Sequence, residues 1–292
     1  MNSALRIQSA GFGVTIQDGG RSGFLRFGVT AAGPMDPLAH AMANRAVAAA
    51  PDAAAIEIPF GGLEVVAEYG PATVALAGGR FDIRIDGAPL PAAVVARLAA
   101  GSTLSVRGGK VGMWCYLALA GTMEVPPVMG STATHTRSGI GGMAGRGLAP
   151  GDLIPLTLSG ADVAEGEILA PHLDDNGRSP VRVMVGPQAD HFSPRERERF
   201  LCQTWTISGR SDRMGYRLDG KPLRYARSFN IVSDGIAMGS VQVPGDGLPI
   251  VLMADRQPTG GYPEDRNSDQ CGSRRSSPAP TGLGSALRRS LT

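Results

Sequence analysis

Glycine and proline recur along the whole chain and limit how long any regular element can be. The 292 residues include 41 glycines and 22 prolines, a pattern that favours many short strands joined by tight turns. Period-two alternation in Ala55–Ile58, Phe81–Asp86 and Val181–Val185 predicts strands with one buried face. Trp114–Leu119 and Ile250–Met253 are continuously apolar and predict strands buried on both faces. We therefore expect a mainly β protein.

Two segments carry the signals of a helix start. Asp36 followed by Pro37 predicts a capped helix that runs through the alanine-rich stretch to about Ala49. Ser193 followed by Pro194 and, three residues after the cap, by Glu196 forms a capping box. That second helix is expected to end near residue 202.

The polar stretch His172–Pro180 lies between two strand-rich regions and is the best candidate for a linker. It predicts a first domain over residues 1–170 and a second domain over residues 180–263. Residues 264–292 are rich in arginine, serine and proline and show almost no strand pattern. We expect this third part to be a disordered tail.

Charge and composition exclude some classes of protein. The five arginines and three acidic residues from Glu264 onward account for the net charge of +2, so the rest of the chain is balanced. A nucleic-acid-binding protein would show a concentrated basic face. No apolar run is long enough to span a membrane, and the N-terminus lacks the pattern of a signal peptide. Three scattered cysteines support neither a disulfide framework nor a metal site, so we expect a cytoplasmic protein.

Two motifs in the first half are open to a structural or a binding interpretation. In Gln17–Arg21, Asp18 can accept bonds from turn amides while Arg21 can fork onto a carboxylate. The segment is either a turn with an internal ion pair or a site for an anion. Gly33–Pro37 leads into a helix N-terminus, where amides can bind an anion, but Asp36 favours simple capping.

Three further motifs follow. Gly139–Gly147 is a glycine-rich loop without the Gly-Lys-Ser/Thr of a phosphate-binding loop, so it predicts either a surface loop or a cover for a ligand. Ser211–Arg217 holds two arginines and an acid, which suit either carboxylate binding or an ion-pair network. Asp255–Pro263 directly follows a buried strand, a common position for a functional site.

Taken together, the motifs resemble the biotin-dependent carboxyltransferase-like family, also called allophanate hydrolase subunit 2, over residues 4–263. They occur in the order in which that family has them: Val14–Arg21, Gly33–Pro37, Gly130–Ser131, Gly186–Asp190, Ser211–Arg217, Gln242–Pro244 and Asp255–Pro263.

The resemblance implies a fold and a set of partners. The implied fold is two cyclophilin-like β-barrels with a few short helices. The implied function is that of the C component of an ATP-dependent 5-oxoprolinase, which opens 5-oxoproline to glutamate. This component is inactive without a KipI-type B component and a LamB/YcsF-type A component. ATP would be used by that hetero-oligomer, and whether it binds this chain stays open.

Two alternatives belong to the same family. One is the carboxyltransferase component of a biotin-dependent urea carboxylase, as in urea amidolyase systems. It would receive biotin on a separate carrier because no Met-Lys-Met attachment motif is present. The other is a regulatory binding protein of the KipA type. The first alternative is an enzyme of another class, and the second is not an enzyme.

The resemblance and the chemistry of the motifs give candidate site residues. Arginine forks and amides suit an activated carboxyl or phosphoryl intermediate. The candidates for catalysis are Arg213, Arg217, Asp255, Arg256 and Gln257. The candidates for substrate binding are Gln17, Asp18, Arg21, Asp212, Thr259, Gly260, Gly261 and Tyr262.

The sequence departs from the family pattern after Pro263. Family members continue with a segment like Lys-Ile-Ala-Thr-Val-Ile, a further strand of the second barrel, whereas this chain continues from Glu264 to Cys271 with polar residues. Those residues can be encoded by GAA GAT CGC AAC AGT GAT CAG TGC, which reads Lys-Ile-Ala-Thr-Val-Ile-Ser one base later. Our hypothesis is a frameshift, in the gene or its sequencing, which leaves the second barrel incomplete.

Overall fold

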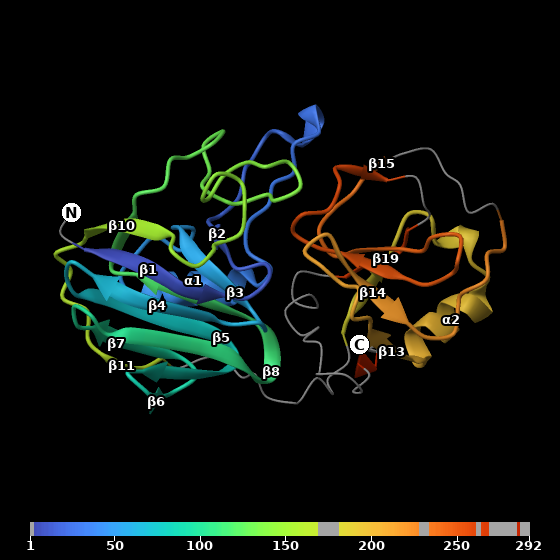
Figure 1. Cartoon of the computed structure of the whole chain (residues 1–292). Coiled ribbons are helices and arrows are strands. Elements are labelled where there is room, and N and C mark those ends of the chain that lie inside the picture. The colour runs from blue at the N-terminus through green and yellow to red at the C-terminus, as the bar shows by residue number, and fades with distance from the viewer. Residues whose placement is uncertain (1–2, 169–180, 228–233, 261–263, 269–284, 287–292) are drawn as a thin grey trace. The chain divides into compact units, whose positions relative to one another are not determined.

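The computed structural model describes residues 3–168, 181–227, 234–260, 264–268 and 285–286 (Figure 1). The chain divides into two compact units, which are described separately. Unit 1 comprises Met1–Ser22 and Ala32–Leu173, and unit 2 comprises Gly23–Ala31 and Asp174–Thr292. Each unit consists mainly of strands, so the predicted mainly β class is confirmed. In the described part of the chain, no helix is both long and apolar enough to cross a membrane.

Unit 1 is built on one antiparallel sheet. Its strands pair in the order β11-β7-β5-β8-β4-β1-β10-β9, while β2 and β3 join beside β8 and β6 joins beside β5. The strands are β1 (Ala4–Ala10), β2 (Thr15–Gln17), β3 (Ala55–Pro59), β4 (Leu63–Glu68), β5 (Ala72–Ile85), β6 (Ala88–Leu90), β7 (Val94–Leu98), β8 (Thr103–Leu119), β9 (Gly121–Met123), β10 (Leu153–Leu158) and β11 (Gly166–Glu167).

The long strands β5 and β8 are the centre of this sheet. They pair from Val74↔Leu119 to Ile85↔Leu104, and the register shifts on either side of Arg80. A glycine is required opposite this bulge, since a Cβ on Gly109 would stand 1.5 Å from the Arg80 carbonyl oxygen. The pairings of the described strands form an open path, so they do not by themselves complete the closed barrel that the resemblance implies.

Helix α1 (Pro37–Ala46) packs on β5 and β8, and Figure 1 shows it against the sheet of unit 1. The contact is made by small side chains. Ala39 and Ala43 of the helix meet alanines of the two strands in a core cluster separate from the larger apolar core of the sheet. The predicted cap is confirmed, because Asp36 Oδ1 accepts hydrogen bonds from the amides of residues 38 and 39. The helix ends three residues before the predicted Ala49, since Ala48 adopts a left-handed φ of 56°.

Unit 2 contains a seven-stranded sheet in the order β12-β19-β16-β17-β14-β13-β20 and a separate pair, β15-β18. Trp205 and Phe200 are among the largest side chains of its core. Ser193 caps α2 as predicted, and the helix ends at Cys202. The elements are β12 (Val183–Val185), α2 (Pro194–Cys202), β13 (Thr204–Ile207), β14 (Gly215–Asp219), β15 (Asp234–Gly235), β16 (Ser240–Gln242), β17 (Ile250–Leu252), β18 (Thr259–Gly260), β19 (Glu264–Ser268) and β20 (Ser285–Ala286), with 3-10 turns η1 (Leu25–Phe27) and η2 (Ala189–His191).

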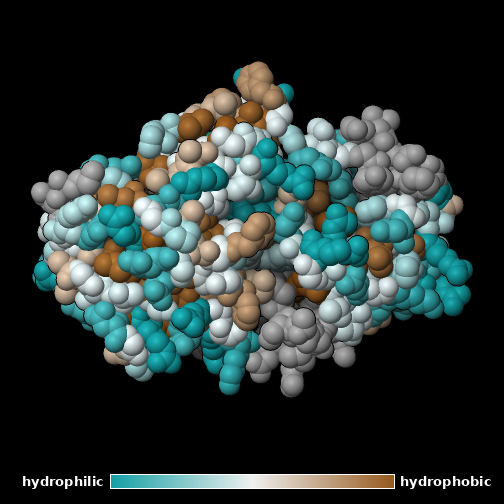
Figure 2. Space-filling view, viewed as in Figure 1, coloured by the Kyte–Doolittle hydropathy of each residue, from teal (hydrophilic) through white to brown (hydrophobic). Residues whose placement is uncertain are grey.

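The surface mixes hydrophilic and apolar side chains on the face drawn in Figure 2. Large apolar side chains that reach the solvent include Phe12, Phe27 and Met184. Exposed apolar residues spread in this way are ordinary for a protein surface.

Candidate functional site

Asp18 fastens the end of β2 to a neighbouring loop of unit 1. One carboxylate oxygen accepts hydrogen bonds from the Gly20 amide (2.8 Å) and the Ser131 hydroxyl (2.6 Å). The other accepts from the amide and hydroxyl of Thr132, at 2.6 and 3.0 Å. Burial acts to raise the pKa of Asp18, but these hydrogen bonds outweigh it and hold the pKa below its usual value.

Arg21 is buried, with 1% of the residue exposed, and donates to the same loop. Its Nε donates to the Val128 carbonyl at 3.1 Å, and its Nη2 donates to the carbonyls of Ser131 and Ala133. A buried arginine that donates to several carbonyls of one loop holds that loop firmly, in addition to the backbone bonds between Val128 and Ser131.

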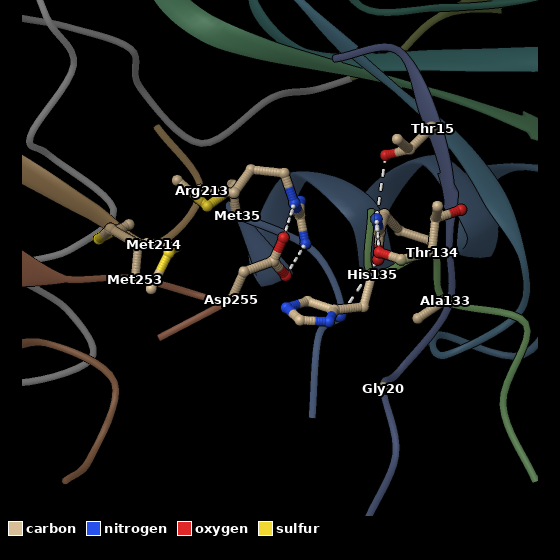
Figure 3. Close-up of polar contacts among 12 residues, drawn as sticks. Thr15, Gly20, Met35, Ala133, Thr134, His135, Arg213, Met214, Met253 and Asp255 are labelled. Atoms are coloured by element: carbon tan, nitrogen blue, oxygen red, sulfur yellow. Dashed lines mark hydrogen bonds and ion pairs between the residues drawn. The ribbon is translucent and has the colours of Figure 1, made fainter. Parts of the chain in front are cut away.

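Gln17 is also buried and is bonded at both ends of its amide. Its Nε2 donates to the Thr15 hydroxyl (2.9 Å) and the Thr134 carbonyl (3.0 Å). Figure 3 labels both of these partners. Its Oε1 accepts from the Gly33 amide at 3.1 Å. The structure therefore supports the turn in Gln17–Arg21, with Arg21 bonded to backbone carbonyls. The internal ion pair and the binding of an anion stay predictions.

The buried carboxylate of Glu57, near the start of α1, is not among the candidates predicted from the sequence. Glu57 Oε2 accepts from the Tyr116 hydroxyl (2.7 Å) and the Met35 amide (2.8 Å), and the Tyr116 oxygen accepts from the Asp36 amide (2.7 Å). The prediction that Ala55–Ile58 has one buried face is wrong, because every residue of β3 is buried. The polar–apolar alternation is misleading here, because α1 and the loop before it cover the face on which Glu57 lies.

Burial also shifts the pKa values of two neighbours of that carboxylate. The pKa of Tyr116 is raised well above its usual value, first by burial and then by the charge of Glu57. The pKa of His40 is lowered by burial, and its ring meets Tyr116 edge-on at 5.5 Å between centroids. These groups hold the Gly33–Pro37 segment and the first turn of α1 in place.

The glycine-rich loop of residues 139–147 is packed closely against residues 133 and 134. A Cβ on Gly141 would stand 2.0 Å from the Ala133 carbonyl oxygen, and one on Gly142 would stand 2.0 Å from the Thr134 hydroxyl. The end of the loop is fixed by a two-armed ion pair between Arg146 and Asp152, both arms at 2.7 Å. The glycines serve close packing, and a covering role over a ligand stays a prediction.

In unit 2, Arg213 and Asp255 form the ion pair drawn in Figure 3. Two parallel hydrogen bonds, each 2.9 Å long, join Nε and Nη2 of Arg213 to the two carboxylate oxygens. Only 11% and 6% of the two side chains is exposed. A backbone bond from the Asp255 amide to the Arg213 carbonyl (2.8 Å) reinforces the pair. This geometry unites the two motifs that sequence analysis singled out in the second half of the chain.

The other candidates of Ser211–Arg217 have different positions. Asp212 closes a turn, because its Oδ1 accepts from the Met214 amide (2.9 Å) and the Gly215 amide (3.3 Å). Arg217 is exposed on β14, and its amide donates to the Ser211 hydroxyl (3.0 Å). Of the two arginines in this motif, Arg213 is the one held in a buried ion pair.

Arg256 directly follows Asp255 in the sequence, and its side chain is half-buried. Its Nε donates to the Ile236 carbonyl at 3.1 Å, and burial lowers the pKa of its guanidinium. Gln257 and Thr259 are exposed, whereas Gly260 is buried in β18. The remaining two candidates, Gly261 and Tyr262, lie outside the described residues.

Comparison with known proteins places these features in a family context. The family model "Carboxyltransferase domain, subdomain A and B" matches residues 27–266. The chain is similar to the C component of 5-oxoprolinase from Escherichia coli, with 39% identity over 259 residues, which cover 89% of this chain and 82% of the relative.

Two solved structures share the fold. K. lactis urea amidolyase matches 98% of this chain with 26% identity and a TM-score of 0.87, but the chain spans only 18% of that protein. The protein TTHA0988 matches 94% of this chain with 29% identity and a TM-score of 0.84, and the chain spans 54% of it.

Proposed function

The chain belongs to the carboxyltransferase domain family, subdomains A and B, and from that membership we propose that it is the C component of an ATP-dependent 5-oxoprolinase. The observation that carries the proposal is the 39% identity to the E. coli C component across 82% of that relative's length. The reaction adds water across the ring amide of 5-oxoproline to give glutamate, and hydrolysis of ATP drives it.

The polar residues of unit 2 support this assignment chemically. The two hydrogen bonds between Arg213 and Asp255 fix the backbone just after β17 (Ile250–Leu252). Arg256 and Gln257 come directly after this fixed position in the chain. Arg256 presents a guanidinium of lowered pKa in a half-buried setting, where a cation binds carboxyl or phosphoryl oxygens more strongly than it does in water. We assign Arg256 to substrate binding and Arg213 with Asp255 to positioning it.

We keep Arg217 and Gln257 as further proposed catalytic residues. Both side chains are exposed, so a ligand can reach them, but their exposure leaves their positions less fixed than that of Arg213. In unit 1, Gln17, Asp18 and Arg21 hold the segments around residues 33 and 128–134, and we keep them as separate candidates for substrate binding.

The proposal includes an assembly. The relative's name makes it one component of several, and we propose that this chain likewise works only in a complex. Its partners there are a KipI-type B component and a LamB/YcsF-type A component in the cytoplasm. ATP is used by that complex, and we assign no residue of this chain to it.

A carboxyltransferase role in a urea carboxylase is the second candidate. The TM-score of 0.87 to K. lactis urea amidolyase favours it, but the identity of 26% is lower than that to the 5-oxoprolinase component. In this role the chain would take a carboxyl group from biotin held on a separate carrier.

The choice between the two is tested by substrate-stimulated ATP hydrolysis. The chain is mixed with the A and B components, and release of ADP is measured with 5-oxoproline or with urea and bicarbonate. We expect 5-oxoproline to stimulate the release of ADP, and urea with bicarbonate to leave it unchanged. Stimulation by urea in a mixture that contains a biotin carboxylase and its carrier would transfer the assignment to the second candidate.

A further inference from the structure

Residues 126–130, which follow β9 in unit 1, form an exposed apolar ledge. The run is Pro-Pro-Val-Met-Gly, so it carries no charged, hydroxyl or amide side chain. Four of its residues are exposed, Val128 is half-buried, and 46% of Met129 is open to solvent. The ledge starts from Val125, which is buried in the apolar core of the sheet. Contiguous exposed apolar residues, unlike scattered ones, are typical of contact sites.

The tip of the ledge is a tight turn in a conformation that methionine disfavours. Val128 and Ser131 exchange both backbone hydrogen bonds, at 2.8 and 3.3 Å, around a loop of two residues. Met129 and Gly130 have positive φ angles of 53° and 78°, which makes this loop a type I′ turn. Asparagine, aspartate or glycine is favoured at the first position, and a methionine there is strained. Strain of this kind concentrates at functional positions.

Two buried side chains of opposite charge hold the turn in place. Asp18 accepts three hydrogen bonds from Ser131 and Thr132. Arg21 donates to three carbonyls of residues 128–133. The two prolines add stiffness, because each fixes its own φ. A surface that is already rigid loses little conformational entropy when it binds, so the ledge is preorganised for a partner.

The chemistry of the ledge selects a protein as its partner. A small polar molecule such as 5-oxoproline needs hydrogen-bond donors and a cation, and the side chains of the ledge offer neither. Proline has no amide hydrogen, so two of the five backbone positions lack a donor as well. Methionine is enriched in protein interfaces, where its flexible thioether fills irregular apolar recesses.

We propose that the ledge docks into an apolar recess of another protein component of the complex, with Met129 as the anchor. The inference rests on the proposed function, because that function supplies the complex. Asp18 and Arg21 act here as positioning residues, which keep Met129 at the tip of the turn. A residue better suited to the turn would relieve the strain but would remove the anchor.

The test variant is Met129→Asn, which suits the turn and removes the apolar anchor. Surface plasmon resonance measures binding of the whole chain to the immobilised B component and, separately, to the A component. The dissociation constant should rise about 10-fold for the component that receives the ledge. The melting temperature of the free chain should rise by about 2 °C, because asparagine relieves the strained φ. A merely structural turn would show the gain in stability without the loss of affinity.

Two further variants complete the design. Met129→Leu keeps an apolar side chain of similar volume and should bind nearly as tightly as the wild type. Ala48→Asn is the matched control, because Ala48 is also exposed and has a positive φ of 56°. It should gain stability as well but leave the affinity unchanged. Unchanged affinity of Met129→Asn for both components, or an equal loss in Ala48→Asn, would overturn the inference.

Steady-state kinetics separate docking from contact with the substrate. In the complete mixture, Met129→Asn should raise the concentration of this chain that gives half-maximal glutamate formation and leave the KM for 5-oxoproline unchanged at saturation. A raised KM with unchanged affinity would make Met129 a substrate contact and refute the docking. If the wild-type mixture makes no glutamate, the proposed function fails, but binding that Met129→Asn weakens still supports the ledge. No binding of the wild-type chain to either component would refute it.

Discussion

Two ion pairs of unit 2 differ mainly in how much water surrounds them. Arg213 and Asp255 are nearly buried, with 11% and 6% of their side chains exposed, whereas Arg227 and Asp190 keep 65% and 57%. Removing one partner of a buried pair leaves the other charge without compensation, but an exposed charge is simply hydrated again.

Asp255→Ala should therefore destabilise the chain by about 3–5 kcal/mol. The matched change Asp190→Ala should cost about 1 kcal/mol or less. Urea unfolding, monitored by tryptophan fluorescence, measures both values, because Trp205 lies in the core of the same unit. Equal losses in the two variants would show that the Arg213–Asp255 pair is not a rigid part of the site.

His40 gives the stability of unit 1 a dependence on pH. Burial lowers the pKa of its ring below the usual 6.5, so the unfolded chain takes up a proton near pH 6.5 while the folded chain resists it. The free energy of unfolding should then fall as pH decreases from about 7 to about 5. His40→Gln should flatten this fall when the free energy of unfolding is measured across that pH range. An identical slope in wild type and His40→Gln would rule out this origin.

At the scale of elements, β19 is the strand whose sequence fits its position least. It lies between β12 and β16, yet its residues are Glu-Asp-Arg-Asn-Ser, of which Asp, Asn and to a lesser degree Glu are depleted in strands. The family model stops at residue 266, and the match to the E. coli relative covers 82% of its length. We propose that the segment from Glu264 onward is read out of frame.

Replacing residues 264–270 with Lys-Ile-Ala-Thr-Val-Ile-Ser should raise the free energy of unfolding by about 2 kcal/mol or more, because a strand between two others can bury isoleucine and valine. The control carries Lys-Ser-Ala-Thr-Thr-Ser-Ser at the same positions and should show little gain. Urea unfolding of the three chains measures the difference. Equal stabilities, or coding DNA with an intact frame and other codons, would contradict the proposal.

The elements were predictable where the signal was local. Asp36 and Ser193 marked both helix starts because capping depends on residues within one turn. The burial of Glu57 and the close packing of the Gln242 amide were not predictable, since each depends on what a distant segment covers. Residue 57 meets residues 35 and 116, and the amide of residue 242 packs closely against residue 260. The Arg213–Asp255 pair joins motifs 42 residues apart, and sequence identified both motifs but not their bond.

At the scale of the molecule, the chain corresponds to one module of larger systems. It covers 82% of the E. coli 5-oxoprolinase component and 18% of K. lactis urea amidolyase, so the same fold occurs both in a chain of similar length and as a small part of a much longer one. This distribution fits a module that contributes one step and depends on other modules for the rest. The account therefore predicts that the isolated chain turns over no substrate.

The decisive experiment measures glutamate formation from 5-oxoproline and ATP. The initial rate is measured with this chain and the A and B components together, and again with each of the three left out. We expect glutamate only in the complete mixture, for the chain as it stands or for the form with the restored segment at residues 264–270. An equal rate in the mixture that lacks this chain would contradict its assignment to 5-oxoprolinase.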